Sequence, residues 1–227
     1  MTITFLGTGA ADWPLEKPKG TAEFRRFSSA LVDDSLLIDP GPQVMDALAE
    51  FQIDPGKIRY IINTHRHSDH FSKTSVQALA DNGARFYPLE NGESKILGKY
   101  TVHAYKGNHG TCAETVHYII HDGKNCIFYG LDGAWLLYDE IQAIKQCKPG
   151  IAILDGTVGE IDGDYRIFEH NNLQMVREMQ KALSPYVGKF VISHLARTLH
   201  TDHSTLCKLM SKDNITVAFD GLSLLIE

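Results

Sequence analysis

Hydrophobic residues occur in many short runs separated by polar segments, and this pattern predicts an α/β protein with many strands. Thr2 to Leu6 alternates with the period of a half-buried strand, and Ser29 to Val32 with Leu36 to Asp39 predicts a hairpin around Asp33 and Asp34. Further strand-like runs are Thr101 to Tyr105, Thr115 to His121, Asn125 to Tyr129, Ile151 to Leu154, Phe190 to Ser193 and Ile215 to Ala218. Helical patterns cover Gln43 to Phe51, Leu136 to Gln146, Leu173 to Leu183 and Ser204 to Met210.

No internal repeat, low-complexity tract or linker interrupts these elements. We therefore expect one domain over residues 1–227, a length that can bury one large core.

A cluster of polar residues follows the buried run Arg59 to Thr64, which predicts a short strand. The cluster has the pattern H-x-H-x-D-H and places four metal-binding side chains within six residues: His65, His67, Asp69 and His70. Phe71 to Asn82 then predicts a helix that ends at Gly83. Imidazole and carboxylate groups suit zinc, manganese or iron. His65 and His67 can bind one ion, and Asp69 and His70 can bind a second.

Two ions need more ligands than one loop can supply. His109 lies in a Gly-flanked turn between two strand-like runs, whereas Asp132 and His194 each end an apolar run. Taken alone, Asp132 is also typical of a turn before Gly133, and His109 of a loop histidine. The appearance of all three residue types in order at strand ends favours the metal site.

This order of motifs resembles the metallo-β-lactamase superfamily. The resemblance implies a four-layer αββα sandwich with two divalent transition-metal ions, Zn²⁺ or Mn²⁺ and alternatively iron. It implies that His65, His67 and His109 bind the first ion, and that Asp69, His70 and His194 bind the second. The carboxylate of Asp132 would bridge the two ions.

Phe168-Glu-His170-Asn-Asn-Leu173 resembles the phosphodiesterase branch of that superfamily, in which a histidine that opens a helix acts as a general acid or contacts phosphate. The resemblance implies a metal-dependent phosphoric diester hydrolase, in which a hydroxide bridging the two metals attacks phosphorus. His170 and Asp69 are its expected catalytic residues. Imidazole can protonate an alkoxide leaving group near neutral pH. The alternative is that His170 is only a residue at a helix N-terminus.

Within that branch, the chain resembles the cyclic-phosphate phosphodiesterases of phosphonate breakdown, which open phosphoribosyl 1,2-cyclic phosphate. The matching segments include Leu6-Gly-Thr-Gly9, Arg25 to Ser29 and Ala218 to Ser223. Asp12 to Lys19 lacks the cysteines that hold an extra structural zinc in that family, so we expect none here. A small, cyclic phosphodiester is therefore the expected substrate. Arg25 and Arg26 can contact its phosphate or serve as surface charges.

Other activities on the same fold remain open. A lactone or thioester hydrolase would use the same metals without needing His170. A transfer-RNA 3′-end-processing ribonuclease would need a long arm for RNA, for which we see no candidate segment. A metal-dependent sensor would not need an activated hydroxide.

Composition limits the setting. The net charge of −6 argues against a broad nucleic-acid surface, and no apolar segment approaches the length of a membrane span. We expect no cleavable leader, because Met1 to Thr4 leads directly into a predicted strand without a basic region. Cys112, Cys126, Cys147 and Cys207 form no C-x-x-C pair, so we interpret them as free thiols in a reducing cytoplasm. We expect a small-molecule phosphodiester as partner and no membrane or nucleic-acid partner. A homodimer is one option, and the sequence leaves the oligomeric state open.

A few further residues have two interpretations. Asp39 matches a position that the superfamily fills with an aspartate supporting a metal-bound imidazole, or it is a turn residue before Pro40. The remaining strand histidines fit packed or edge positions: His103, His117 and His121. His200 and His203 can line a pocket mouth or begin a surface helix.

Overall fold

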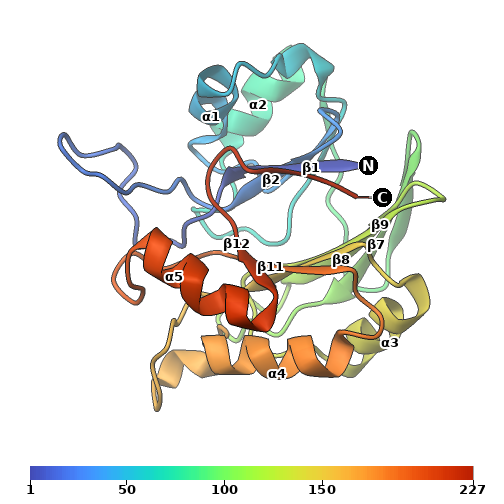
Figure 1. The fold of residues 1–227 in the computed structure, drawn as a ribbon. Coiled ribbons are helices and arrows are strands. Elements are labelled where there is room, and N and C mark those ends of the chain that lie inside the picture. The colour runs from blue at the N-terminus through green and yellow to red at the C-terminus, as the bar shows by residue number, and fades with distance from the viewer. Residues whose placement is uncertain (227) are drawn as a thin grey trace.

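The computed structural model describes residues 1–226 and has four layers (Figure 1). Two helices cover one face of a six-stranded sheet, and a seven-stranded sheet packs against its other face. The remaining helices cover the outer face of the second sheet. The αββα sandwich expected from the sequence is therefore confirmed.

The first sheet has the order β13-β1-β2-β3-β4-β5. It is antiparallel from β13 to β3 and parallel from β3 to β5. The predicted hairpin is present as β2 and β3, whereas β5 and β13 were not predicted. The bounds are Thr2–Gly7 for β1, Ser29–Val32 for β2, Leu36–Ile38 for β3, Tyr60–Ile62 for β4, Arg85–Phe86 for β5 and Ser223–Leu225 for β13.

The second sheet has the order β12-β11-β10-β9-β8-β7-β6. Strands β6 to β9 are antiparallel neighbours, and β9 to β12 run parallel. The parallel strands are buried on both faces, which explains their unbroken apolar runs. The bounds are Ser94–Leu97 for β6, Tyr100–Lys106 for β7, Val116–His121 for β8, Cys126–Gly130 for β9, Ile151–Asp155 for β10, Lys189–Ser193 for β11 and Ile215–Val217 for β12.

The helices match the predicted helical patterns. They are α1 Val44–Glu50, α2 Lys73–Asp81, α3 Tyr138–Cys147, α4 Leu173–Leu183 and α5 His203–Met210. Side-chain caps explain several starts, because Ser72, Asn172 and Asp202 accept hydrogen bonds from backbone N–H groups of the first turn. Short 3₁₀ turns occupy Pro55–Lys57, Tyr165–Phe168 and Ser211–Asp213.

The core divides into three apolar clusters that follow the layers. Tyr100, Tyr118 and Tyr129 are buried between the two sheets. Phe128 belongs to the cluster between the second sheet and α3, α4 and α5, and Leu48 to the cluster beneath α1 and α2. The first cluster joins the two sheets through their facing side chains.

Two cysteines correct the interpretation of the sequence. Cys126 at the start of β9 and Cys147 at the end of α3 form a disulfide, with Cα atoms 6.5 Å apart. The prediction of four free thiols is wrong for this pair and holds for Cys112 and Cys207. The two cysteines are 21 positions apart and gave no local signal, because the fold alone brings them together. The prediction of a reducing compartment is therefore no longer supported by four free thiols.

Candidate metal centre

The candidate metal ligands lie on loops that leave the carboxyl ends of strands in both sheets. His65 to His70 follow β4 in the first sheet, whereas Asp132 follows β9 and His194 follows β11 in the second. His109 lies in the turn between β7 and β8. The carboxyl ends of parallel strands meet at one edge of a sheet, which is where open α/β sheets usually bind ligands.

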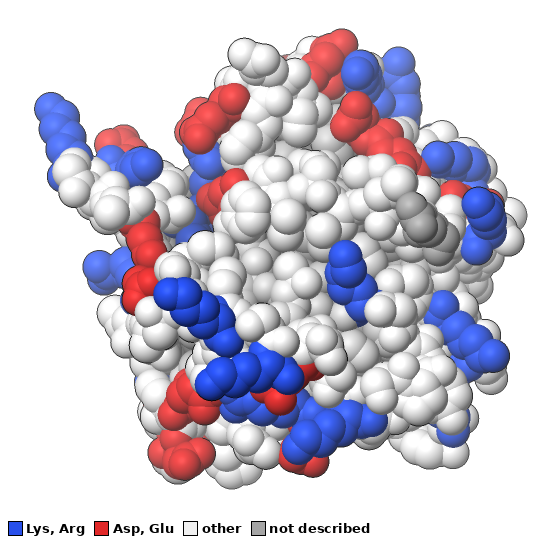
Figure 2. All heavy atoms as spheres, viewed as in Figure 1, with Lys and Arg blue, Asp and Glu red and all other residues white. Residues whose placement is uncertain are grey.

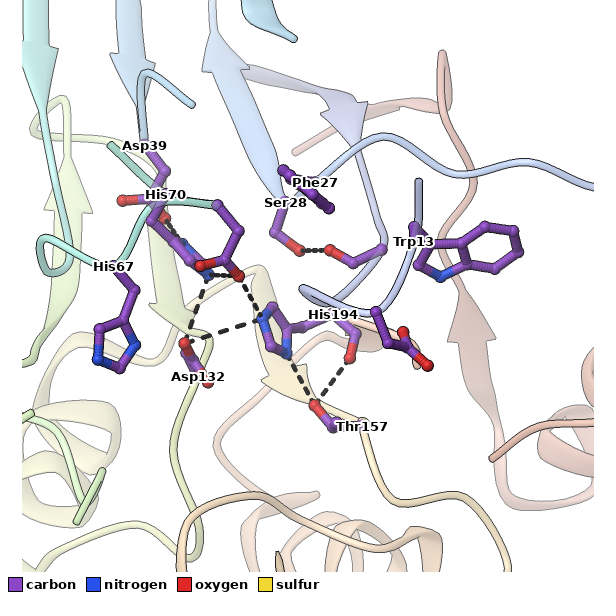
Figure 3. A network of polar contacts seen from close by, with 12 residues as sticks. Trp13, Phe27, Ser28, Asp39, His67, His70, Asp132, Thr157 and His194 are labelled. Atoms are coloured by element: carbon purple, nitrogen blue, oxygen red, sulfur yellow. Dashed lines mark hydrogen bonds and ion pairs between the residues drawn. The ribbon is translucent and has the colours of Figure 1, made fainter. Parts of the chain in front are cut away.

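Asp132 lies at the centre of this group. Its Oδ2 atom is 3.0 Å from His65 Nε2 and 3.4 Å from His70 Nε2. The same oxygen is 3.7 Å from His109 Nε2 and 3.8 Å from His194 Nε2. Figure 3 shows His70 and His194 directed toward each other, with Asp132 joined to both. One carboxylate thus faces imidazoles from both predicted ligand sets.

The side chains fall into the two sets that the superfamily resemblance implied. Within each set, one ligand atom per residue lies within 4.8 Å of the others. The first set is His65, His67, His109 and Asp132, and the second is Asp69, His70, Asp132 and His194. All seven predicted ligands are therefore brought together, and Asp132 is shared.

Buried atoms of the cluster are candidates to bind a cation. His70 Nε2 and His194 Nε2 are buried without a hydrogen-bond partner. Such atoms cost free energy unless they are satisfied. Nitrogen and carboxylate donors that converge in this way fit two divalent ions such as zinc or manganese.

Asp39 orients one of these ligands, which settles its two interpretations in favour of a supporting role. Its Oδ2 atom is 2.9 Å from His70 Nδ1, and its Oδ1 atom accepts hydrogen bonds from the backbone and hydroxyl of Thr64. With Nδ1 occupied, the Nε2 atom of His70 is directed to the metal site. A metal-bound imidazole typically has such a carboxylate partner.

Backbone strain marks the same loops. Asp39, Asp132 and His194 have φ values of 59°, 61° and 59°, in the left-handed region that non-glycine residues rarely adopt. Such residues cluster at functional sites, where surrounding structure holds them in place. Gly41 is required nearby, because a Cβ atom there would lie 2.3 Å from the carbonyl oxygen of Asp69.

Charges within the cluster shift its protonation before any ion binds. Burial lowers the pKa of His70, but Asp69 and Asp39 outweigh it and raise that pKa to about 9. Burial and the neighbouring His70 lower the pKa of His65 to about 4. Burial raises the pKa of Asp132, but the surrounding histidines hold it well below its ordinary value. The metal-free site therefore combines carboxylates with protonated imidazoles.

His170 lies beside the shared carboxylate and outside both ligand sets. Its Nδ1 atom is 3.0 Å from Asp132 Oδ1 and 3.1 Å from Asp155 Oδ2. Burial lowers its pKa, but these two carboxylates raise it to about 9. His170 precedes α4 and does not open it, because Asn172 is the N-cap. A third grouping of His170 with Asp132, Asp155 and His194 also has metal-binding geometry.

Sequence reasoning missed Asp155. This buried residue ends β10, accepts hydrogen bonds from Thr157 N and Oγ1, and also lies 3.4 Å from His194 Nδ1. A signal was present, because Leu154-Asp155-Gly156 repeats the Leu131-Asp132-Gly133 arrangement at a strand end. Glu169, which groups with His109 and His170, was missed because it has no such context.

An open pocket of about 290 Å³ lies over the cluster. It is lined by His67, Asp69, His109, Asp132, His170 and His194, together with Arg166. Asp164 holds the Arg166 guanidinium through Nε at 2.9 Å and Nη2 at 2.5 Å. The pocket thus joins a fixed cation to the candidate metal ligands.

Arg25 and Arg26 do not line this pocket. Arg25 is buried and donates to Thr8 Oγ1 and the carbonyl of Ala218, while Arg26 pairs with Glu50 and Asp220. Their contacts indicate a structural role and give no support to a phosphate contact.

His200 and His203 also lie outside this lining. His200 Nε2 is 3.1 Å from the carbonyl oxygen of Thr157, and His203 begins α5 beside Arg25. Like the two arginines, they are held by neighbouring parts of the protein.

Sequence comparison gives partial matches. Residues 28–73 match the profile of the Metallo-beta-lactamase superfamily, a segment that includes the H-x-H-x-D-H cluster. A UPF0173 protein of Pyrococcus abyssi is 29% identical over 113 residues, which make up 42% of this chain and 51% of that protein. The chain therefore spans about half of the length of the curated relatives it matches.

Structural comparison covers the whole fold. The metallo-beta-lactamase fold protein YhfI of Bacillus subtilis has a TM-score of 0.77 at 16% identity, covering 98% of both chains. A diphosphatase of the PhnP family has a TM-score of 0.75 at 18% identity, covering 100% of this chain and 98% of its own. The short form of human tRNase Z has a TM-score of 0.72 at 18% identity, with both chains fully covered. The profile match over residues 28–73 and these structures show that the chain has the metallo-β-lactamase fold.

Proposed function

We propose that this chain is a dinuclear-metal hydrolase that cleaves a small phosphodiester. The observation that carries the proposal is the pair of ligand sets joined through Asp132, with His170 fixed against the same carboxylate. When bound, two such ions supply a nucleophile from water and offset negative charge on the reacting group. The PhnP-family diphosphatase and tRNase Z share the fold, so the fold alone does not select the substrate.

His170 is the proposed proton donor to the leaving oxygen. The carboxylates of Asp155 and Asp132 lie close to its Nδ1 atom, and their negative charge favours the protonated imidazole. His170 also lines the pocket. A departing alkoxide needs a proton near neutral pH, whereas the thiolate that leaves a thioester has less need of one.

Arg166 is the proposed contact for a phosphate oxygen. Guanidinium groups bind phosphate through directed N–H donors, and Asp164 limits the positions this one can adopt. The pocket volume of about 290 Å³ favours a small substrate. A cyclic phosphodiester is the proposed form, as the resemblance to the cyclic-phosphate branch implies.

The surface gives little support to an RNA substrate. On the face drawn in Figure 2, acidic side chains lie beside the basic ones around α4 and α5. The net charge is −6. Strong binding to a nucleic-acid backbone depends on clustered Lys and Arg side chains.

A substrate panel tests the proposal. The purified chain, loaded with zinc or manganese, is assayed with bis(p-nitrophenyl) phosphate, p-nitrophenyl phosphate, a lactone, a thioester and a cephalosporin. We expect turnover of the diester and little of the monoester, with the Asp132→Ala variant inactive. Faster hydrolysis of the lactone or thioester without diesterase activity would contradict the substrate class and leave the fold unaffected.

A further inference from the structure

Two histidines face each other on the second sheet, away from the candidate metal centre. His103 on β7 and His121 on β8 have parallel rings with an interplanar angle of 18°, and their Nε2 atoms are 3.3 Å apart. Two imidazole nitrogens bound to one tetrahedral zinc ion at about 2.0–2.1 Å are separated by about 3.4 Å. The pair is therefore spaced as two ligands of a single ion.

The disulfide lies beside this pair. Cys126 is the cross-strand partner of His121 between β8 and β9, and Cys147 reaches it from the end of α3. All four side chains line one open hollow in the surface, together with Gln146. Burial and the neighbouring His121 lower the pKa of His103, which favours the neutral imidazole that binds metals.

We propose that reduction of the Cys126–Cys147 disulfide creates a second, structural metal site of the Cys₂His₂ type, with His103 and His121 as the other ligands. Two thiols of a reductant supply two electrons and two protons, and leave joined as their own disulfide. A divalent ion such as zinc then binds the two histidines and both cysteine sulfurs, which release two protons. Four ligands of these types are typical of structural zinc.

The site would hold the same two elements together in both redox states. In the oxidised protein the disulfide ties the end of α3 to β9. In the reduced protein the ion would tie α3 to β7, β8 and β9 together. The free thiols left by reduction would therefore not release the helix when zinc is present. This role is independent of the proposed hydrolysis.

Cobalt(II) is the probe for this site, because thiolate ligands give it a near-ultraviolet charge-transfer band that histidine and carboxylate ligands do not. The seven candidate ligands of the catalytic centre include no cysteine. The disulfide is reduced with a phosphine, which becomes a phosphine oxide by taking oxygen from water. After reduction, we expect the full chain to bind one additional ion and to show the band. The oxidised protein should bind cobalt without the band.

Variants decide which residues are responsible. Cys126→Ser with Cys147→Ser should abolish the band, whereas Cys112→Ser and Cys207→Ser should retain it. The double variant His103→Asn/His121→Asn keeps the disulfide. After reduction, it should need at least about tenfold more cobalt to reach half of the band, which corresponds to a loss of about 1.4 kcal/mol in binding free energy. Circular dichroism checks folding, and the histidine variant carries the test if the cysteine variant misfolds. No band in the reduced protein, or unchanged affinity in the histidine variant, would overturn the proposal.

Discussion

Asp132 connects the two predicted ligand sets through a single carboxylate. Four imidazoles lie within 4 Å of its Oδ2 atom, and its Oδ1 atom lies next to His170. Its left-handed backbone and full burial mean that the β9 loop positions this group at some cost to local stability. The residue therefore joins metal binding to the proposed proton transfer.

Replacement of Asp132 should affect both ions. We expect Asp132→Ala, purified with zinc and manganese, to retain well below the roughly two ions per chain of a two-metal site. Both sets lose their shared ligand, which is the physical reason. Elemental analysis of the protein gives the count, and Asp162→Ala, an exposed aspartate, is the matched control. A variant that keeps two ions would show that Asp132 is not the bridge.

His170→Ala should reduce activity while leaving metal content and folding nearly unchanged. Its rate on a diester with an alkoxide leaving group should fall by about 10²–10⁴, the usual effect of removing a general acid. A diester with p-nitrophenolate as the leaving group needs little protonation and should lose much less. Rate measurements on both substrates check this.

Two other outcomes for His170 would change its role. Equal losses on both substrates would indicate phosphate binding instead of proton donation. Loss of an ion would favour the alternative grouping with Asp155 and His194.

At the scale of elements, the sequence predicted those with a strong local signal. The hairpin, the five helices and the strands that carry the ligands were predicted because apolar periodicity and caps identify them. The edge strands β5, β6 and β13 were not predicted. Asp155 was missed although Leu154-Asp155-Gly156 repeats the arrangement around Asp132. The disulfide was missed because only the fold brings β9 and α3 together. The assignment of metal roles to the seven ligands stays a prediction.

The start of α4 is a testable element, because it follows directly from His170. Asn172 Oδ1 accepts a hydrogen bond from Met175 N at 2.9 Å. Asn172→Ala should lower the free energy of unfolding by about 0.5–2 kcal/mol, the usual contribution of an N-cap. Urea unfolding measures this, with the exposed Asn91→Ala as control. A change no greater than that of the control would show that the cap contributes little here.

On the scale of the whole molecule, loops from both sheets bring their charged side chains together at one edge. No helix in residues 1–226 combines the length and apolar character needed to cross a membrane. The interior holds buried Asp39, Asp69, Asp132 and Asp155 at one edge. Such a concentration of carboxylates and histidines is stable only with compensating charge, from protons or from metal ions.

The metal-free and metal-loaded proteins should therefore respond to pH in opposite directions. The pKa of His70 is raised from 6.5 to about 9 in the folded chain, and His170 shifts the same way. Their protonation stabilises the metal-free fold fully below pH 6.5, and this contribution is lost as pH rises through about 9. Each group accounts for at most about 1.4 kcal/mol per pH unit. His65, with its lowered pKa, is neutral throughout this range.

Metal binding reverses the sign, because the ligand His70 must lose its proton to bind an ion. From pH 6.5 to 9 the affinity should rise, and the ions should add about 2.7 kcal/mol of stability at a free concentration of 100 times Kd. Thermal unfolding with and without a chelator measures both trends, and calorimetry in two buffers of different ionisation enthalpy counts the protons released. If the stability of both forms changed with pH in the same way and no protons were released, metal binding would not displace protons from these histidines.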